Sequence, residues 1–71
     1  MKYTWIIYDI SNDKKRLALS RRCKHIGLLR VQKSVFLGQA QKKLLKELKK
    51  DASKYVLSPQ DRVFFVPMTE E

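Results

Sequence analysis

The sequence contains one cysteine, Cys23, and one histidine, His25. A lone cysteine excludes an internal disulfide and a zinc site built from several cysteines. The lack of disulfides is typical of proteins in a reducing compartment, so we expect a cytoplasmic location. Neither residue indicates nucleophilic catalysis. We expect Cys23 to be a small core residue. We expect His25 to lie at a helix C-terminus, where it caps the helix and interacts favourably with the helix dipole.

Long hydrophobic runs are absent as well. Every apolar segment is far shorter than the ~18 residues needed to span a bilayer, and the run after Lys2 is too short for a signal peptide. With only two glycines, the chain has no glycine-rich phosphate loop, and it lacks the aromatic pattern of an RNA-recognition strand. We therefore expect no membrane span and neither of these two nucleotide-binding motifs.

The chain has 71 residues, a length that predicts one domain over residues 1–71. A chain of this size buries only ~60% of the surface of its unfolded form, so its core is small. A second copy of the chain covering one face would enlarge the buried area. We therefore expect a homodimer.

Acidic residues are scarce compared with basic ones. Seven Asp and Glu face sixteen Lys and Arg, which gives a formal net charge of +9. An excess of this size predicts a polyanionic partner, nucleic acid above all. A membrane surface is a poorer match, because no helix pairs a basic face with exposed Trp or Phe. The plainer alternative is a soluble protein that happens to be basic.

Residues 2–10 predict the first strand. Residues 4–8 are all aromatic or β-branched, and the carboxylate of Asp9 appears where this run ends. Ser11, Asn12 and Asp13 then favour a turn or a helix N-cap. A carboxylate at the end of a strand and ahead of a helix is a common position for a metal ligand. A role for Asp9 in capping the turn is the simpler alternative.

A helix is predicted over residues 13–26. Leu19, Cys23 and Ile26 are spaced to form one buried stripe, and Gly27 is expected to end the helix in a left-handed conformation. The remaining surface is mostly basic and has no acid after Asp13 to balance it. This excess indicates more than a solvated face, and its members are Lys14, Lys15, Arg16, Arg21, Arg22 and Lys24.

Residues 30–39 predict β structure with an imperfect alternation. Lys33 shares a face with the aliphatic residues, Phe36 lies opposite them, and Gly38 marks a bend or a bulge. A hairpin of two short strands and one long kinked strand are both compatible with this pattern. Phe36 is expected at a dimer interface or near the active cleft, or alternatively in the core under the helices.

The second half of the chain predicts a helix over residues 40–54, a turn over residues 58–61 and a strand over residues 62–66. The helix has an apolar stripe formed by Leu44, Leu45, Leu48 and Ala52, continued by Tyr55. The strand is a continuous apolar run suited to burial on both faces, and Pro67 is expected to end it. The order of elements predicts an α+β, ferredoxin-like βαββαβ fold, with an antiparallel sheet and both helices on one face.

Asp9 is the one acid whose position is not explained by local structure. The others are assigned to a helix start (Asp13), an exposed helix face (Glu47, Asp51), a turn (Asp61) and the chain end (Glu70, Glu71). Magnesium sites often use one or two carboxylates together with water and phosphate, so two copies of Asp9 in a two-fold dimer would form such a site.

Arginines are the best candidates for phosphate contacts, because a guanidinium binds phosphate through two hydrogen bonds. We assign nucleic-acid binding to Arg16 and Arg30, with Lys14 and Lys15 beside them. Tyr8, next to Asp9, is expected either to be a core aromatic or to orient a phosphate.

Three segments closely resemble CRISPR-associated protein 2, the small partner of the CRISPR adaptation integrase. They are residues 8–13 (YDISND) followed by Arg16, residues 30–38 (RVQKSVFLG) and residues 62–67 (RVFFVP). The resemblance covers essentially the whole chain. It implies a ferredoxin-like homodimer in which Asp9 of each chain faces its mate and holds a divalent metal. Positions that the family uses functionally match Tyr8, Asp9, Arg16, Arg30 and Phe36.

The resemblance implies a metal-dependent endonuclease acting on RNA or duplex DNA, with Asp9 and Tyr8 in catalysis and magnesium on Asp9. A second expectation is a non-catalytic DNA-binding bridge in the integrase complex. A third is a toxin-like ribonuclease related to virulence-associated protein D. Two departures matter. Ala18 stands where some members have a second arginine. Members also usually continue into a strand that crosses to the partner, so we expect a weaker dimer.

Overall fold

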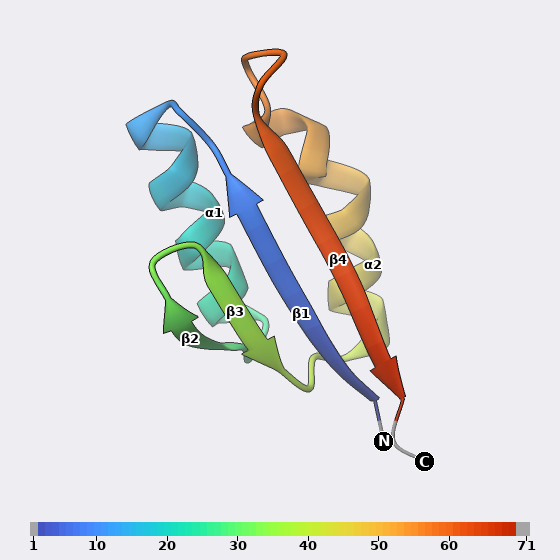
Figure 1. Cartoon of the computed structure of the whole chain (residues 1–71). Helices are drawn as coiled ribbons and strands as arrows, with labels where there is room; N and C mark the ends of the chain where they lie inside the picture. The colour runs from blue at the N-terminus through green and yellow to red at the C-terminus, as the bar shows by residue number, and fades with distance from the viewer. Residues whose placement is uncertain (1, 70–71) are drawn as a thin grey trace.

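The structure, a computed structural model, describes residues 2–69 of the chain. Four strands and two α-helices follow one another in the order expected from the sequence (Figure 1). A single turn of 3₁₀-helix follows the second α-helix. The elements are β1 (Lys2–Asp9), α1 (Asp13–His25), β2 (Leu29–Gln32), β3 (Val35–Gly38), α2 (Lys42–Asp51), η1 (Ala52–Tyr55) and β4 (Arg62–Thr69).

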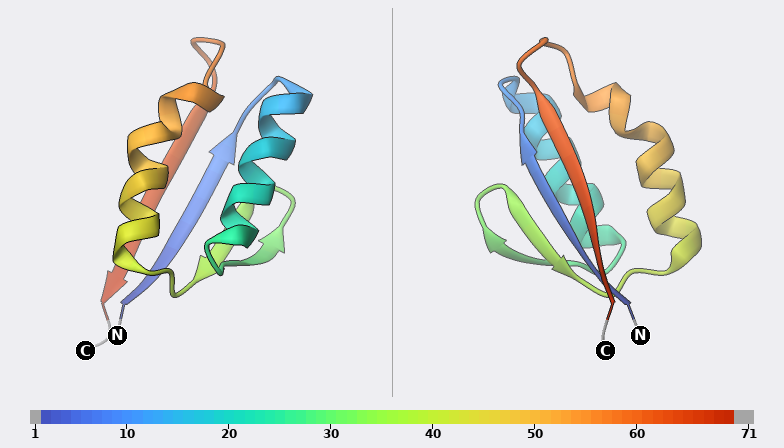
Figure 2. Two further views of the ribbon diagram at one scale, coloured as in Figure 1. Left: turned by 180° about the vertical axis from the view of Figure 1, so that it is seen from behind. Right: turned by 45° about the vertical axis from the view of Figure 1, so that its right-hand side comes forward.

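The four strands form one antiparallel sheet in the order β2-β3-β1-β4. This order makes β1 a central strand, and both helices cover the same face of the sheet (Figure 2). The predicted ferredoxin-like α+β fold is therefore confirmed. The C-terminal end of β1, which carries Asp9, lies at one end of the sheet beside the start of α1 (Figure 1).

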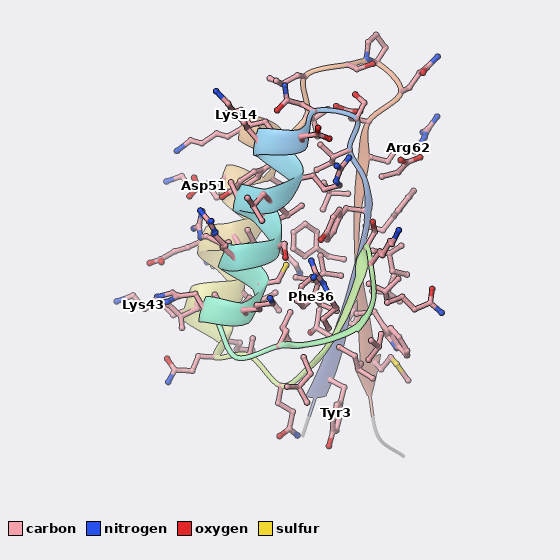
Figure 3. All side chains as sticks on the ribbon, turned by 90° about the vertical axis from the view of Figure 1, so that its left-hand side faces the viewer. Tyr3, Lys14, Phe36, Lys43, Asp51 and Arg62 are labelled. Atoms are coloured by element: carbon pink, nitrogen blue, oxygen red, sulfur yellow. The ribbon has the colours of Figure 1, made fainter. Side chains whose placement is uncertain are left out.

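The core lies between the sheet and the helix layer. Alternate residues of β1 point toward the helices, so Ile6 and Tyr8 are buried, while Ile7 and Asp9 are exposed on the other face. Figure 3 shows Phe36 between the two layers. The buried apolar residues are Ile6, Tyr8, Ile10, Leu19, Cys23, Ile26, Leu28, Phe36 and Leu48, which confirms the core position expected for Cys23.

The segment between the helices is a hairpin of two short strands. Lys33 and Ser34 form its turn, and a register shift lies between Arg30 and Gln32. Of the two alternatives for residues 30–39, the hairpin is therefore confirmed and the single kinked strand is wrong. The turn and the register shift explain why the alternation of apolar and polar residues is imperfect. Gly38 ends β3 where a Cβ atom would lie only 3.2 Å from the side chain of Leu28. The close approach explains a glycine at this position.

Both helices are shorter than predicted. α1 ends at His25, and Gly27 follows with a φ of 100°, which confirms the left-handed conformation expected there. The helix begins with Asn12 as N-cap, whose side chain accepts a hydrogen bond from the amide of Lys15 at 2.9 Å. α2 starts at Lys42 rather than at residue 40. Its C-terminal part, from Ala52, tightens into the 3₁₀ turn.

β4 is longer and more exposed than predicted. It continues through Pro67 to Thr69, because β4 is an edge strand, where a missing amide donor is tolerated on the side without a neighbour. Phe65 is half-buried beneath the helices, but Phe64, Val66 and Met68 are 51%, 42% and 45% exposed. The expected burial of this strand on both faces is therefore wrong for the single chain. Within residues 2–69, no helix is long and apolar enough to cross a membrane.

Candidate active site and nucleic-acid interface

An open cleft of about 650 Å³ lies between the first half of α1, the end of β1 and the turn of the β2–β3 hairpin. The strand β3 begins opposite Ile7, so the last residues of β1 extend beyond the hairpin and leave this space. Residues three and four positions apart share one face of a helix, which brings one side of α1 to the cleft. The lining residues are Asp9, Ile10, Asp13, Arg16, Leu17, Ser20, Arg30, Lys33 and Ser34.

Asp9 lies at the rim of this cleft. Asp9 is exposed, and it pairs with Arg62 of β4 across the sheet. The alternation of side chains along β1 places it on the same face of the sheet as Ile7. The rim is therefore where the cleft opens onto the outer face of the sheet. An exposed carboxylate next to basic side chains is a suitable ligand for a hard cation that keeps most of its water.

One chain supplies few acidic ligands for a metal. Over residues 2–69, no group of three or more His, Cys, Asp or Glu side chains comes together. Asp13 lines the same cleft, but its carboxylate forms an ion pair with Arg16. The residues present thus fit a cation held by Asp9 with phosphate and water, or by two copies of Asp9. They do not fit a closed cage of protein ligands.

Arg16 is oriented by two contacts at the entrance to α1. One Nη donates to the carbonyl oxygen of Ile10 at 3.2 Å, and the other donates to the carboxylate of Asp13. Asp13 therefore does more than place a charge at the helix start, which was its expected role. It holds Arg16 in the cleft and offsets part of its charge.

Arg30 enters the cleft from the opposite wall, on β2. Its Nη2 donates to the hydroxyl of Ser20 at 2.6 Å, and its Cζ lies 5.3 Å from the centre of the Phe36 ring. The structure therefore brings together three of the predicted site residues, Asp9, Arg16 and Arg30.

Tyr8 lies behind the cleft rather than in it. It is 3% exposed, and its hydroxyl donates to the carbonyl oxygen of Lys33 at 3.4 Å. Its ring stacks on that of Phe36 with centroids 6.3 Å apart. Of the two roles expected for Tyr8, this position matches the core aromatic. A contact between its hydroxyl and a phosphate would require this hydrogen bond to open.

Phe36 is fully buried in the single chain. β3 turns this residue toward the helices, so the dimer interface, one of the places expected for it, does not match the single chain, whereas a position near the cleft does. Its ring instead supports Arg30 from beneath the cleft. The alternative expectation, a core residue under the helices, is confirmed.

Lys14 and Lys15 do not line the cleft. They lie on the first turn of α1, where Lys14 points away from the sheet (Figure 3). The lining residues that sequence reasoning did not assign to the site include Ser20, Lys33 and Ser34. The sequence contained an indication for Lys33. In a continuous strand, its charged side chain would lie on the same face as the aliphatic residues, which argues for a turn at this position. For Ser20 no signal existed, since its partner comes from another element.

A buried carboxylate anchors the loop that leads from β1 into α1. Oδ1 of Asp61 accepts hydrogen bonds from the amide and hydroxyl of Ser11 at 3.0 and 2.9 Å. Oδ2 accepts from the amides of Leu57 and Ser58 at 3.1 and 3.2 Å. The Ser11 amide is the main reason why the pKa of the Asp61 carboxyl lies below its ordinary value. Asp61 thus joins this loop to the turn before β4.

Comparison with known proteins identifies the family. The family described as CRISPR associated protein Cas2 matches residues 1–71. The chain belongs to this Cas2 family. It is 38% identical over 63 residues to the CRISPR-associated endoribonuclease Cas2 of Aeropyrum pernix, which covers 89% of the chain and 68% of the relative. The protein of the same name from Korarchaeum cryptofilum is 31% identical over 65 residues, or 92% of the chain and 70% of that relative.

Solved structures agree with the fold. A hypothetical protein, TT1823 from Thermus thermophilus, superposes with a TM-score of 0.80 at 30% identity, covering 97% of this chain and 83% of that protein. Cas2 of Streptococcus pyogenes gives a TM-score of 0.75 at 20% identity, covering 90% and 82%. The resemblance to CRISPR-associated protein 2 seen in the sequence is therefore confirmed.

Proposed function

We propose that this Cas2-family chain is a metal-dependent endonuclease of CRISPR adaptation, acting on RNA as a homodimer in the cytoplasm. The observation that carries the proposal is the cleft, in which the exposed carboxylate of Asp9 lies with three basic side chains, Arg16, Arg30 and Lys33. A carboxylate beside phosphate-binding cations is the set of groups that phosphodiester hydrolysis needs. The relatives named endoribonuclease support RNA as the substrate.

The residues of the cleft divide into two roles. The arginines and Lys33 bind the phosphates on either side of the reacting bond and stabilise the charge that develops on its oxygens. Asp9 would hold a magnesium ion at the rim of the cleft. When bound, that ion supplies a water molecule of lowered pKa as the nucleophile. Asp9 also accepts hydrogen bonds from water and so orients it. Lys14 and Lys15 attract the polyanion from outside the cleft.

Homodimerisation is supported by the outer face of the sheet. Tyr3, Ile7, Phe64, Val66 and Met68 are between 37% and 51% exposed there, on two adjacent strands. A contiguous exposed apolar surface of this kind marks an interaction site. Asp9 follows Ile7 on the same face, so a two-fold contact through this face would place both copies of Asp9 on one shared surface.

A second function is favoured by the helix layer. Its outer side carries most of the excess charge, and Lys14 and Lys43 point from it away from the sheet (Figure 3). A dimer with two such surfaces would serve as a platform that binds duplex DNA for the CRISPR-associated integrase. In this alternative, Asp9 has no catalytic part. A toxin-like ribonuclease is the third candidate, and a gene neighbourhood that includes the integrase gene would argue against it.

The test is cleavage of labelled single-stranded RNA and duplex DNA, with and without magnesium, by wild type and Asp9→Asn. We expect magnesium-dependent RNA cleavage by wild type and none by the variant, with folding, dimerisation and binding unchanged. Asparagine keeps the size of the side chain but removes the charge that captures the cation.

Glu47→Gln is the matched control, because it removes one exposed carboxylate from α2, away from the cleft. It should cleave like wild type. Equal cleavage by Asp9→Asn would show that Asp9 is not the ligand. A wild type that binds both polymers and cuts neither would favour the DNA platform.

A further inference from the structure

We propose that Ser20 is a positioning residue that, together with the ring of Phe36, holds the guanidinium of Arg30 ready for a phosphate of the nucleic acid. The inference rests on the proposed function, because it concerns how the same cleft holds its substrate. It assigns a role to a residue of α1 that has no charge and is almost completely buried at the wall of the cleft.

The exposed guanidinium of Arg30 lies against two buried side chains, those of Ser20 and Phe36. Arg30 is an exposed residue of a short strand, whereas Ser20 and Phe36 are 2% and 0% exposed. The hydroxyl of Ser20 accepts a hydrogen bond of 2.6 Å from Nη2 of Arg30. The Phe36 ring lies 5.3 Å from Cζ of the same guanidinium. The two supports come from different elements, α1 and β3, so they restrain the guanidinium from two directions.

The chemistry of the guanidinium leaves room for a ligand. It has five N–H donors in a rigid plane, and Ser20 uses one of them while Phe36 lies against a face. The other donors remain available for a phosphate in the bidentate geometry that arginine favours. A free arginine loses considerable rotamer entropy on binding, so a side chain already held in place binds more tightly.

The surroundings of Ser20 agree with this role. A buried hydroxyl is unfavourable unless it is hydrogen-bonded, and the partner found for Ser20 is Arg30. Ser20 also lies four residues after Arg16 on the side of α1 that lines the cleft. Tyr8 also stacks on Phe36, with centroids 6.3 Å apart. The two arginines thus enter the cleft from opposite walls, each with its own support.

The experiment is a double-mutant cycle on RNA binding, measured by fluorescence anisotropy of a labelled single-stranded RNA without magnesium, so that cleavage plays no part. The variants are Ser20→Ala, Arg30→Ala and the double variant, with circular dichroism melting for each. Ser53→Ala is the matched control, because it removes an exposed serine hydroxyl of η1, an element that does not line the cleft.

We expect Ser20→Ala to weaken binding roughly fivefold, the equivalent of one net hydrogen bond, and Arg30→Ala to weaken it about tenfold or more. Ser20→Ala should have no further effect in the Arg30→Ala background, because its influence acts through that side chain. Ser53→Ala should bind like wild type. Phe36→Leu tests the second support in the same way, and its effect on binding should also vanish without Arg30.

The failures are distinguishable. If Arg30→Ala weakens binding and Ser20→Ala does not, or if the two effects simply multiply, Ser20 does not position Arg30 and the inference is overturned. If Arg30→Ala itself binds like wild type, Arg30 contacts no phosphate, and the proposed use of the cleft fails as well. If Ser20→Ala lowers both the melting temperature and the RNA affinity in the Arg30→Ala background as well, its role is only structural and the inference is overturned.

Discussion

The carboxylate of Asp61 accepts two hydrogen bonds from Ser11, a residue fifty positions earlier in the chain. Ser11 is two residues beyond Asp9, in the loop between β1 and α1. The position of the cleft's rim therefore depends on a residue that is not in the cleft. Asp61 is 8% exposed, and its four hydrogen-bond donors come from two loops, the β1–α1 loop with Ser11 and the loop before β4 with Leu57 and Ser58.

This contact predicts a dependence of stability on pH. Because hydrogen bonding lowers the pKa of Asp61 in the folded state, its contribution is complete above the unfolded pKa of about 3.9. The contribution is lost as the pH falls through the folded value. Asp61→Asn should therefore melt at a lower temperature than wild type at pH 7, and the gap should narrow below about pH 4. Thermal melts across this range test it, and a gap independent of pH would contradict it.

The ion pair between Asp13 and Arg16 predicts that Asp13→Asn binds RNA more tightly than wild type. Asp13→Asn removes the ion pair that offsets the charge of Arg16, while the carbonyl oxygen of Ile10 still holds this side chain. RNA affinity should therefore rise a few-fold, and the salt slope should steepen by up to ~0.7, the value for one phosphate on a single strand. Glu47→Gln adds the same charge on α2 outside the cleft and should change affinity much less. Equal gains in the two variants would mean that only net charge matters.

The position of Phe36 predicts that its replacement lowers the stability of the fold rather than abolishing dimerisation. Because its side chain is fully buried, Phe36→Ala should lower the free energy of unfolding by ~3–5 kcal/mol. In a chain this small, that is a large part of the total stability. Urea denaturation measures the effect. A variant of normal stability that no longer dimerises would restore the interface position for Phe36.

The exposure of Phe64 on the outer face of the sheet predicts that this face forms the dimer contact. Phe64→Glu places a charge on the exposed apolar face, opposite Ile7, so light scattering should show a monomer where a dimer is expected of the wild type. Leu57→Glu is the control, because Leu57 is 59% exposed in the loop before β4, outside the sheet. A Phe64→Glu dimer of wild-type strength would mean that the chains associate elsewhere.

The burial of Cys23 predicts that its thiol is protected from alkylation in the folded protein. Burial raises the pKa of Cys23 to about 12, although Arg22 and Arg30 act in the opposite direction. At pH 8 only about one thiol in ten thousand would be ionised, and the thiolate is the reactive form. Iodoacetamide should therefore label Cys23 in guanidinium chloride but not in native buffer, as followed by mass spectrometry. Rapid labelling of the native protein would show that α1 opens readily.

The sequence by itself determined the elements and their order. The aromatic and β-branched run before Asp9, the stripe of Leu19, Cys23 and Ile26 and the glycine at position 27 depend on neighbours a few residues away. Periodicity and capping are local properties, so they can be recognised without knowing the fold. The positions of Asp9, Arg16 and Arg30 as candidates for one site also came from the sequence, through its resemblance to a family.

Only the tertiary structure decided which side chains support these residues. Ser20 meets Arg30 across ten residues, Tyr8 meets Lys33 across twenty-five, and Ser11 meets Asp61 across fifty. The face of β3 that Phe36 occupies was undetermined for a related reason. In a strand, a shift of one residue moves every side chain to the opposite face, and the turn at Lys33 and Ser34 sets that register through pairing with β1. Such contacts depend on how the elements pack together, which no local pattern of residues specifies.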